Sequence, residues 1–472
     1  MLKNRRFEDE TKAPILGVRH LQCLLLFTGL AVAFAMRVNF SMAIVAMTDN
    51  NSTSAAEVET YQWTEKTKSM LLSSFFWGYV FTQVPSGQLA RKFGGKTMLV
   101  YGLLMASILT ILTPMAAKIG NWQLVCASRF FQGLSQGVFF PSTHTIISQW
   151  APLEERGLLG AICYSGSQFG TVVMLAVSGI MASSDYGWPC IFYASGAAGI
   201  VWVFIWYIWG ASTPSECKSI SAEEKNLIES SLGRNEDEPK KLLPIPWSKI
   251  FTSLPFLVLC LVHCTHNWGF WTLLIEIPTY MKNVLGMNIK SNALLSALPY
   301  LVMMLLSYVF GIIAMICGKR KYISTSVNRK LFNTIGQWVP VVTLICLGYL
   351  KPGQTSLAVV LLTITVGVNS ATFLGFKVNH IDLSPNFAGV LMGITNCAAN
   401  IMSFLAPLAV GFIVTDEKNP VQWSIVFFIA AFLYFIGNLL FIIFGKTNIQ
   451  IWNDLSTSQD LKKNNNNNVE LQ

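Results

Sequence analysis

The sequence predicts an all-α membrane protein in which twelve transmembrane helices form two six-helix halves. Of its 472 residues, 53% are hydrophobic and only 12% are charged, about half the charged share of an average soluble protein. Apolar runs of about 20 residues, the length that crosses the hydrocarbon core of a bilayer, recur along the chain. These runs do not alternate as barrel strands do, and backbone groups in lipid must bond within their own segment, so we expect helices.

The first six spans are predicted at residues 21–47, 69–90, 97–117, 122–149, 157–183 and 188–211, and the second six at residues 251–281, 292–317, 331–350, 356–379, 387–414 and 421–445. Residues 212–250 are the one long polar interruption, and they separate the two halves, 21–211 and 251–445. An N-terminal segment, 1–20, precedes the halves, and a tail, 446–472, follows them. The tail contains a low-complexity asparagine run and is expected to be disordered.

Lysine and arginine are distributed unevenly between the two sides of the predicted membrane. Placing both termini in the cytoplasm gives the cytoplasmic segments 23 of the 33 cations and the opposite loops only 7, as the positive-inside rule requires. Topology thereby explains the net charge of +9, and we exclude nucleic-acid binding. Overlapping glycosylation sequons at Asn50 and Asn51 lie in the loop after the first span, on the predicted non-cytoplasmic side.

Arg37 lies at the centre of the first span, within LQCLLLFTGLAVAFAMRVNFSMAIVAM. A charge at this depth costs about 2.5 to 3.5 kcal/mol on insertion scales, so such a residue is expected to line a polar cavity. In span 4, Arg129, Gln136 and His144 are spaced by seven and eight residues, which on one helix places them on a single face. That face is expected to line the same cavity, although Arg129 could instead extend outward from the end of its span.

Within the spans, three cations, Arg37, Arg129 and Lys377, are accompanied by one clear anion, Glu276. The missing negative charge could be supplied by a substrate, because a guanidinium offers a rigid fork of donors suited to carboxylate or phosphate. Lys377 lies near the cytoplasmic end of span 10 and could also extend outward. The candidates for ion coupling are the titratable residues His144, His263, His266 and Glu276, with hydrogen-bonded packing as the alternative role for each histidine.

Small residues predict where helices approach closely. Gly133 with Gly137, and Gly166 with Gly170, have the GxxxG spacing that allows close backbone contact, and we interpret both pairs as packing sites. Prolines inside or near the ends of spans predict bends; they are Pro85, Pro141, Pro278 and Pro299.

Four motifs carry a resemblance to a known family: RVNFSMAIVAM (37–47), GYVFTQVPSG (78–87), RFFQGLSQGVFFPSTHTIISQWAPLEER (129–156) and NHIDLSPNFAGVLMGITN (379–396). Over residues 19–452 the chain resembles the anion/cation symporter family of the major facilitator superfamily, which includes sialin, the vesicular glutamate transporters and the sodium-dependent phosphate cotransporters. It looks most similar to the insect phosphate cotransporter-like members. The resemblance implies alternating access and anionic substrates, with Arg37, Arg129 and His144 at the substrate cavity.

Two departures from the family pattern affect the expected function. Gln136 replaces the span 4 glutamate that is tied to proton coupling in sialin-like members. His266 stands where the vesicular glutamate transporters carry an arginine, which argues against a glutamate carrier.

We therefore expect a secondary active transporter of a small anion, with sodium-coupled inorganic phosphate as the first hypothesis. The alternatives are a proton-coupled carrier of an organic anion, such as a sialic-acid-like or dicarboxylic substrate, and a non-transporting sensor on the same fold. The expected substrate-binding residues are Arg37, Arg129, Gln136, His144 and His266, and the coupling candidates His144, His266 and Glu276.

The remaining expectations concern chemistry and location. No nucleophile–base pair or metal-ligand cluster is evident, so neither an enzyme nor a cofactor is expected, apart from sodium or a proton as the coupling ion. The expected partners are the small anion and the lipid bilayer. The N-terminal segment lacks the spacing of an acidic dileucine signal, so the plasma membrane is preferred over a lysosomal or vesicular membrane.

Overall fold

The computed structural model describes residues 16–48, 59–63, 65–182, 184–232, 244–285, 289–320, 322–350, 353–416 and 418–453. Within these ranges every regular element is a helix, so the all-α prediction is confirmed. The first half contains α1 (Val18–Met47), α2 (Glu65–Phe93), α3 (Gly95–Gln136), α4 (Phe139–Trp150), α5 (Arg156–Ala182) and α6 (Pro189–Trp209). The connecting segment holds η1 (Pro214–Glu216), α7 (Ala222–Ser231) and α8 (Trp247–Phe251). The second half contains α9 (Leu254–Asn283), α10 (Ile289–Lys319), α11 (Thr325–Gly348), α12 (Thr355–Val368), η2 (Asn369–Phe373), α13 (Phe376–Leu383), α14 (Ala388–Ile413) and α15 (Pro420–Phe444), and η3 (Ile451–Asn453) follows.

Ten helical segments of the described chain are long and apolar enough to cross a membrane. One of them, Gly95–Trp150, holds two predicted spans, because Gly120 and Asn121 leave helical geometry and Asn121 adopts a positive φ of 48°. The Asn121 side chain accepts a hydrogen bond from Trp63 Nε1, which stabilises this turn. The remaining predicted span is α2, which packs between α3 and α14. The chain is thus a multi-pass integral membrane protein, and each predicted span contains helix.

Two predicted spans are not continuous helices. In span 4, α3 ends at Gln136 and α4 begins at Phe139, so the single face proposed for that span is interrupted. Pro141 follows in the first turn of α4, where a missing N–H removes no intrahelical bond. In span 10, η2 separates α12 from α13, and Asn333 Oδ1 accepts a hydrogen bond from the new first N–H at Phe376. The predicted end at residue 379 was wrong, because α13 continues to Leu383.

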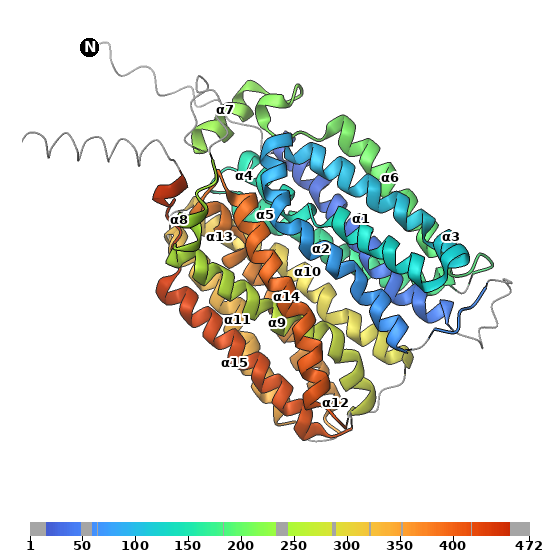
Figure 1. Cartoon of the computed structure of the whole chain (residues 1–472). Helices are drawn as coiled ribbons and strands as arrows, with labels where there is room; N and C mark the ends of the chain where they lie inside the picture. The colour runs from blue at the N-terminus through green and yellow to red at the C-terminus, as the bar shows by residue number, and fades with distance from the viewer. Residues whose placement is uncertain are drawn as a thin grey trace, which may run out of the picture.

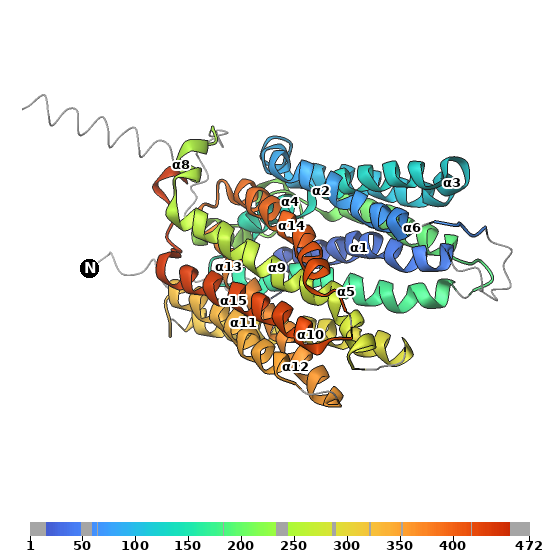
Figure 2. The same cartoon turned by 60° about the horizontal axis from the view of Figure 1, so that its bottom comes forward.

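The two halves lie side by side at the end of the bundle that carries α7 and α8, and their helices run apart towards the opposite end (Figures 1 and 2). We call these the terminal end and the far end. Helices α2, α4 and α5 of the first half contact α10, α13 and α14 of the second. The backbones come especially close where a Cβ on Gly389 would meet the Pro141 carbonyl and one on Gly393 the Gln83 carbonyl. The halves are therefore closed against each other near the terminal end.

The connecting segment docks on the first half through α7. Glu224, which is only 1% exposed, accepts hydrogen bonds from the backbone N–H groups of Val18 and Arg19 and also pairs with the Arg19 guanidinium at 2.9 Å. These contacts satisfy two of the four N–H groups that the start of α1 leaves without a helical partner. A residue in the polar linker therefore caps the first membrane helix.

Glycines set the spacing of the helices in the first half, as predicted. A Cβ on Gly133 would lie 1.9 Å from the carbonyl oxygen of Phe75, and one on Gly170 would lie 1.9 Å from that of Ala31. Both obstacles are backbone atoms, which cannot rotate away. The GxxxG interpretation is therefore confirmed for the contacts of α3 with α2 and of α5 with α1.

We expect Gly133→Ala to destabilise the protein by about 1 to 3 kcal/mol, because the added methyl group must push α2 away from α3. Gly179→Ala is the matched control, since a Cβ at Gly179 meets nothing within 4 Å. Thermal unfolding of the purified protein in detergent checks this. Equal melting temperatures for the two variants would contradict the packing role.

Candidate functional site

Arg37 of α1 lies inside the first half with its guanidinium against aromatic rings. Its side chain is 8% exposed, and its Cζ atom is 4.3 Å from the centroid of Tyr79, 4.4 Å from that of Phe34 and 4.9 Å from that of Phe75. Such contacts stabilise a cation through the negative face of each ring. The Nε atom is buried and has no hydrogen-bond partner among the described residues, so this donor is unsatisfied.

Arg129 of α3 shares one of these rings. Its Cζ atom is 5.0 Å from the centroid of Phe75 and 4.8 Å from that of Phe40, and the residue is 2% exposed. Because both guanidinium carbons lie within 5.0 Å of the Phe75 centroid, they are no more than 10 Å apart. Arg129 also donates to the Arg37 carbonyl at 3.3 Å and to Gln132 Oε1 at 3.1 Å.

The two arginines differ from the other buried arginines in lacking an acidic partner. Arg19, Arg156 and Arg329 are each no more than 4% exposed, and each lies within 4.0 Å of a carboxylate oxygen. No carboxylate lies within that distance of Arg37 or Arg129 in the described part of the chain. A buried charge is costly unless it is paired, so this arrangement suits a site that an anion completes.

Polar side chains connect the aromatic rings around Arg37 to the second half. Asn396 of α14 donates through Nδ2 to Tyr79 Oη at 3.3 Å and to Gln83 Oε1 at 2.8 Å. Gln83 in turn donates to the Gly137 carbonyl at 2.9 Å. Tyr79 therefore contacts both the Arg37 guanidinium and the opposite half.

Gln136 and His144 follow Arg129 along the chain but have different surroundings. Gln136 is 1% exposed, and its Oε1 has no hydrogen-bond partner among the described residues. His144 lies beyond the break, where Nε2 is 3.0 Å from the Lys377 carbonyl of the second half and Nδ1 contacts Tyr164 Oη. The structure thus brings His144 to the boundary between the halves rather than to the arginine pair.

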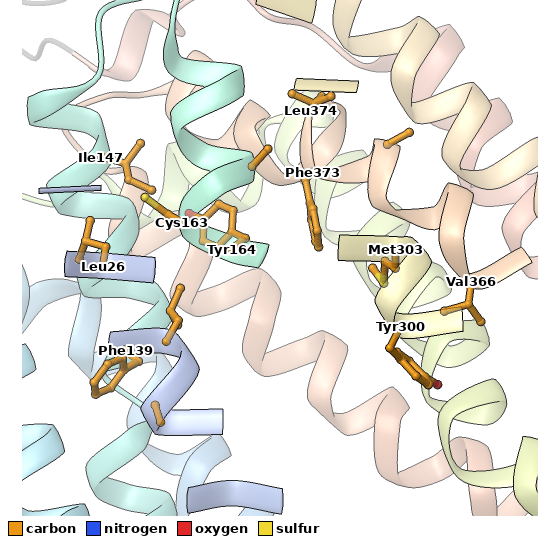
Figure 3. Packing of buried hydrophobic residues seen from close by; sticks show 14 of the residues in the cluster. Leu26, Phe139, Ile147, Cys163, Tyr164, Tyr300, Met303, Val366, Phe373 and Leu374 are labelled. Carbon is orange, nitrogen blue, oxygen red and sulfur yellow. The ribbon is translucent and has the colours of Figure 1, made fainter. Parts of the chain in front are cut away.

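Figure 3 shows Tyr164 of α5 and Phe373 of η2 facing each other across this boundary, with ring centroids 6.3 Å apart. The Lys377 Nζ atom is 4.8 Å from the centroid of Phe373 and 6.0 Å from that of Phe376. Both rings are almost completely buried. The sequence allowed Lys377 either to point into the protein or to extend outward from the end of its span. The structure shows that the side chain points into the protein.

No described contact joins the other predicted site residues to the two arginines. His266 is 1% exposed and packs in the second half against the rings of Phe270, Phe376 and Tyr434. Its Nδ1 has no partner among the described residues. Glu276 is half-buried further along α9. The sequons at Asn50 and Asn51 lie outside the described residues.

Asp382 is a buried acid that sequence reasoning missed. It is 6% exposed, and its carboxylate pairs with Arg329 Nε at 2.7 Å and with Arg156 Nη1 at 3.4 Å. Arg156 comes from the first half and Arg329 from the second, so one carboxylate links both halves at the terminal end. The boundaries predicted for spans 5, 9 and 10 exclude Arg156, Arg329 and Asp382, respectively, so the sequence places all three in loops.

Known proteins resemble the chain over most of its length. Residues 25–407 match the family model described as "Major Facilitator Superfamily". A Drosophila melanogaster protein named "Putative inorganic phosphate cotransporter" is 42% identical over 463 residues, which cover 93% of this chain and 87% of that protein. Human sialin is 37% identical over 93% of this chain and 92% of its own. Vesicular glutamate transporter 1 of Xenopus tropicalis is 33% identical over 96% and 81%, respectively.

Solved structures share the fold at low sequence identity. A proton:xylose symporter bound to 6-bromo-6-deoxy-D-glucose matches with a TM-score of 0.68 at 15% identity, covering 91% of this chain and 96% of that one. The fucose:proton symporter of E. coli matches with a TM-score of 0.64 at 12% identity, covering 91% and 100%. These matches support the arrangement of the helices.

Proposed function

Because the chain belongs to the Major Facilitator Superfamily, and is therefore a membrane transporter and not an enzyme, we propose that it carries a small anion bound between Arg37 and Arg129. The relatives confirm the motif resemblance to the anion/cation symporter group. The observation that carries the proposal is the pair of buried guanidinium groups that share the Phe75 ring and have no carboxylate partner in the described ranges.

An anion between the two guanidinium groups would receive hydrogen bonds from donors that are already positioned. The aromatic rings fix both planar groups, and charge-assisted hydrogen bonds are about twice as strong as neutral ones. The bound anion would also neutralise two like charges that repel each other. The desolvation of both guanidinium groups is therefore a cost of folding and not of anion binding, so their interaction with the anion contributes more of its free energy to affinity.

Alternating access requires that the contact at the terminal end opens while the far end closes. Opening separates the two arginines that share Asp382 and breaks the bond between His144 and the Lys377 carbonyl. Tyr79 provides a connection to this movement, because it touches Arg37 and is also held by Asn396 of the second half. Anion binding at Arg37 can thus change a contact between the halves.

For the substrate, inorganic phosphate remains the first candidate, and sodium is the first coupling ion to test. A tetrahedral oxyanion suits two guanidinium forks, and the name of the Drosophila melanogaster relative points to the same substrate. The second candidate is a proton-coupled carrier of an organic anion, which the motif resemblance to the sialin-like members implies. One structural observation favours it: His144, His263 and His380 gather where the halves meet.

Uptake by purified protein in liposomes separates these versions. We expect labelled phosphate uptake to rise at least several-fold when external sodium replaces potassium at constant pH. Uptake that ignores sodium but collapses when the proton gradient is removed would replace the sodium version with the proton version. No flux of phosphate, sialic acid or dicarboxylates above that of empty liposomes would favour a non-transporting sensor.

A further inference from the structure

Three of the five histidines form one hydrogen-bonded cluster at the boundary between the halves. His144 comes from α4, His380 from α13 and His263 from α9. The His380 ring lies 5.5 Å from that of His144 and 6.0 Å from that of His263. All three are no more than 2% exposed. The role of His380 could not be read from the sequence, because span 10 was expected to end at residue 379.

The acceptors in this cluster fix the positions of most protons. The Lys377 carbonyl lies 3.0 Å from His144 Nε2 and 3.0 Å from His380 Nδ1. A carbonyl oxygen only accepts, and it has two lone pairs, so both nitrogens carry a proton. If His380 is neutral, its Nε2 then accepts from Thr395 Oγ1 at 2.7 Å, and that hydroxyl accepts from His263 Nδ1 at 3.1 Å.

On the other side of the cluster, Tyr164 completes the network. Its hydroxyl contacts His144 Nδ1, which accepts the hydrogen bond as long as His144 is neutral. A proton added to His144 would convert this acceptor into a donor, and the tyrosine hydroxyl would lose its own acceptor. In the closed arrangement, these hydrogen bonds all have a donor and an acceptor when His144 and His380 are neutral.

The charges around the cluster also disfavour an added proton in the closed arrangement. Lys377 carries its ammonium from the same short helix as His380. Among the described elements that pack here, α5 contributes Tyr164 and α14 contributes Thr395, and both side chains are neutral. Helix α9 contributes His266, which packs against Phe376, as His263 also does. Asp382 is occupied by two arginines. A protonated imidazole would meet a like charge and no unengaged carboxylate, which destabilises the contact.

We propose that His144 and His380 form a proton-binding site whose protonation is linked to opening of the terminal end. When the halves separate, His144 leaves the Lys377 carbonyl, and water can solvate a charged imidazole. The open state therefore favours the protonated form, and by reciprocity a bound proton favours the open state. The inference rests on the proposed alternating access, but not on which anion is carried.

This linkage couples proton movement to the alternation of the halves, and the proton gradient sets the direction of net movement. A proton that reaches the cluster from the far end, while the terminal end is closed, shifts the equilibrium towards opening at the terminal end. The opened cluster then faces the solution on that side, where the proton can leave. Such a cycle corresponds to the proton-coupled version of the proposed function.

The test measures opening of the full-length protein in lipid nanodiscs as a function of pH. Two fluorophores, introduced as noncanonical amino acids at exposed Leu153 and Tyr322, report the distance between the halves at the terminal end. For one linked proton, the ratio of open to closed molecules should rise by up to about tenfold for each unit of pH decrease. The useful range is pH 7.5 to 5.5, near the ordinary titration of histidine.

The variants His144→Gln and His380→Gln keep a neutral donor and acceptor but cannot take up the proton. We expect the pH dependence to fall to less than twofold over the same range in at least one of them. His20→Gln is the matched control, because His20 lies in the first turn of α1 and does not belong to the cluster. This variant should behave as the unsubstituted protein. A wild-type ratio that does not change with pH, or a full response in both variants, would overturn the proposal.

Equilibrium binding of labelled phosphate and sialic acid to the same samples separates this inference from the proposed function. Anion binding together with a pH response that both variants retain would reject the proton site and leave anion transport standing. A pH response that the variants lose, without binding of either anion, would support the proton site and count against the proposed substrate site.

Discussion

Replacing Arg37 with alanine is expected to abolish anion uptake while the protein remains folded and inserted. The substitution removes one of two guanidinium groups that have no carboxylate partner in the described part of the chain. Truncating one partner of a buried, hydrogen-bonded charge pair costs about 2 to 5 kcal/mol, which corresponds to a loss of affinity of roughly 30-fold or more. Initial rates of labelled phosphate uptake, normalised to reconstituted protein, measure the effect.

The stability of this variant distinguishes a binding role from a structural one. A buried charge without a partner destabilises the substrate-free protein, so Arg37→Ala should melt at the same or a higher temperature when no anion is present. The stabilisation that phosphate gives to the unsubstituted protein should disappear. Arg37→Lys should retain part of the binding, because it keeps the charge but not the fork. Exposed Lys118→Ala is the control for loss of a positive charge.

The second large effect is expected for Asp382→Asn. This substitution leaves Arg156 and Arg329 buried at the boundary without the carboxylate that they share. Removing one partner from a buried ion pair costs about 3 to 5 kcal/mol. Because water can solvate the arginines once the halves separate, the closed state should bear most of this cost. We expect the ratio of open to closed molecules at the terminal end to rise by about 100-fold, with uptake reduced at least tenfold.

The labels at Leu153 and Tyr322 measure this shift directly. Asp382→Glu keeps the charge and should retain most of the closed population, whereas Asp416→Asn removes an acid from an exposed loop and should change nothing. If Asp382→Asn leaves the distance distribution unchanged, the carboxylate does not hold the halves together. A variant that aggregates instead is distinguished by gel filtration, and Arg156→Gln then provides a second way to break the link.

The sequence predicted the helical fold well because the membrane imposes a simple rule. Spans must be long, apolar and internally hydrogen-bonded, so the length of each run identifies a helix without knowledge of its neighbours. The breaks at Gln136 and Val368 were not predicted. They depend on tertiary contacts, such as the Asn333 side chain that caps the restart at Phe376.

The sequence predicted a site residue only where its position in a span is unusual by itself, as a charged residue in the middle of an apolar run is. Arg37 stands out because a cation at mid-span is costly wherever its neighbours lie. The shared Phe75 ring could not be foreseen, because it depends on the close approach of α2 and α3 at Gly133. Asp382 was missed because an acid that follows an apolar run is usually a loop residue. The signal that could have found it is NHID at 379–382, directly after a span that already contained Lys377.

The most direct test of the central claim is equilibrium binding of labelled phosphate, with the organic anions as competitors, to purified protein and to the variants Arg37→Ala and Arg129→Ala. The account predicts saturable binding of one anion per chain that both substitutions reduce at least 30-fold, while Lys118→Ala binds normally. Saturable binding of the same affinity in both arginine variants would contradict it.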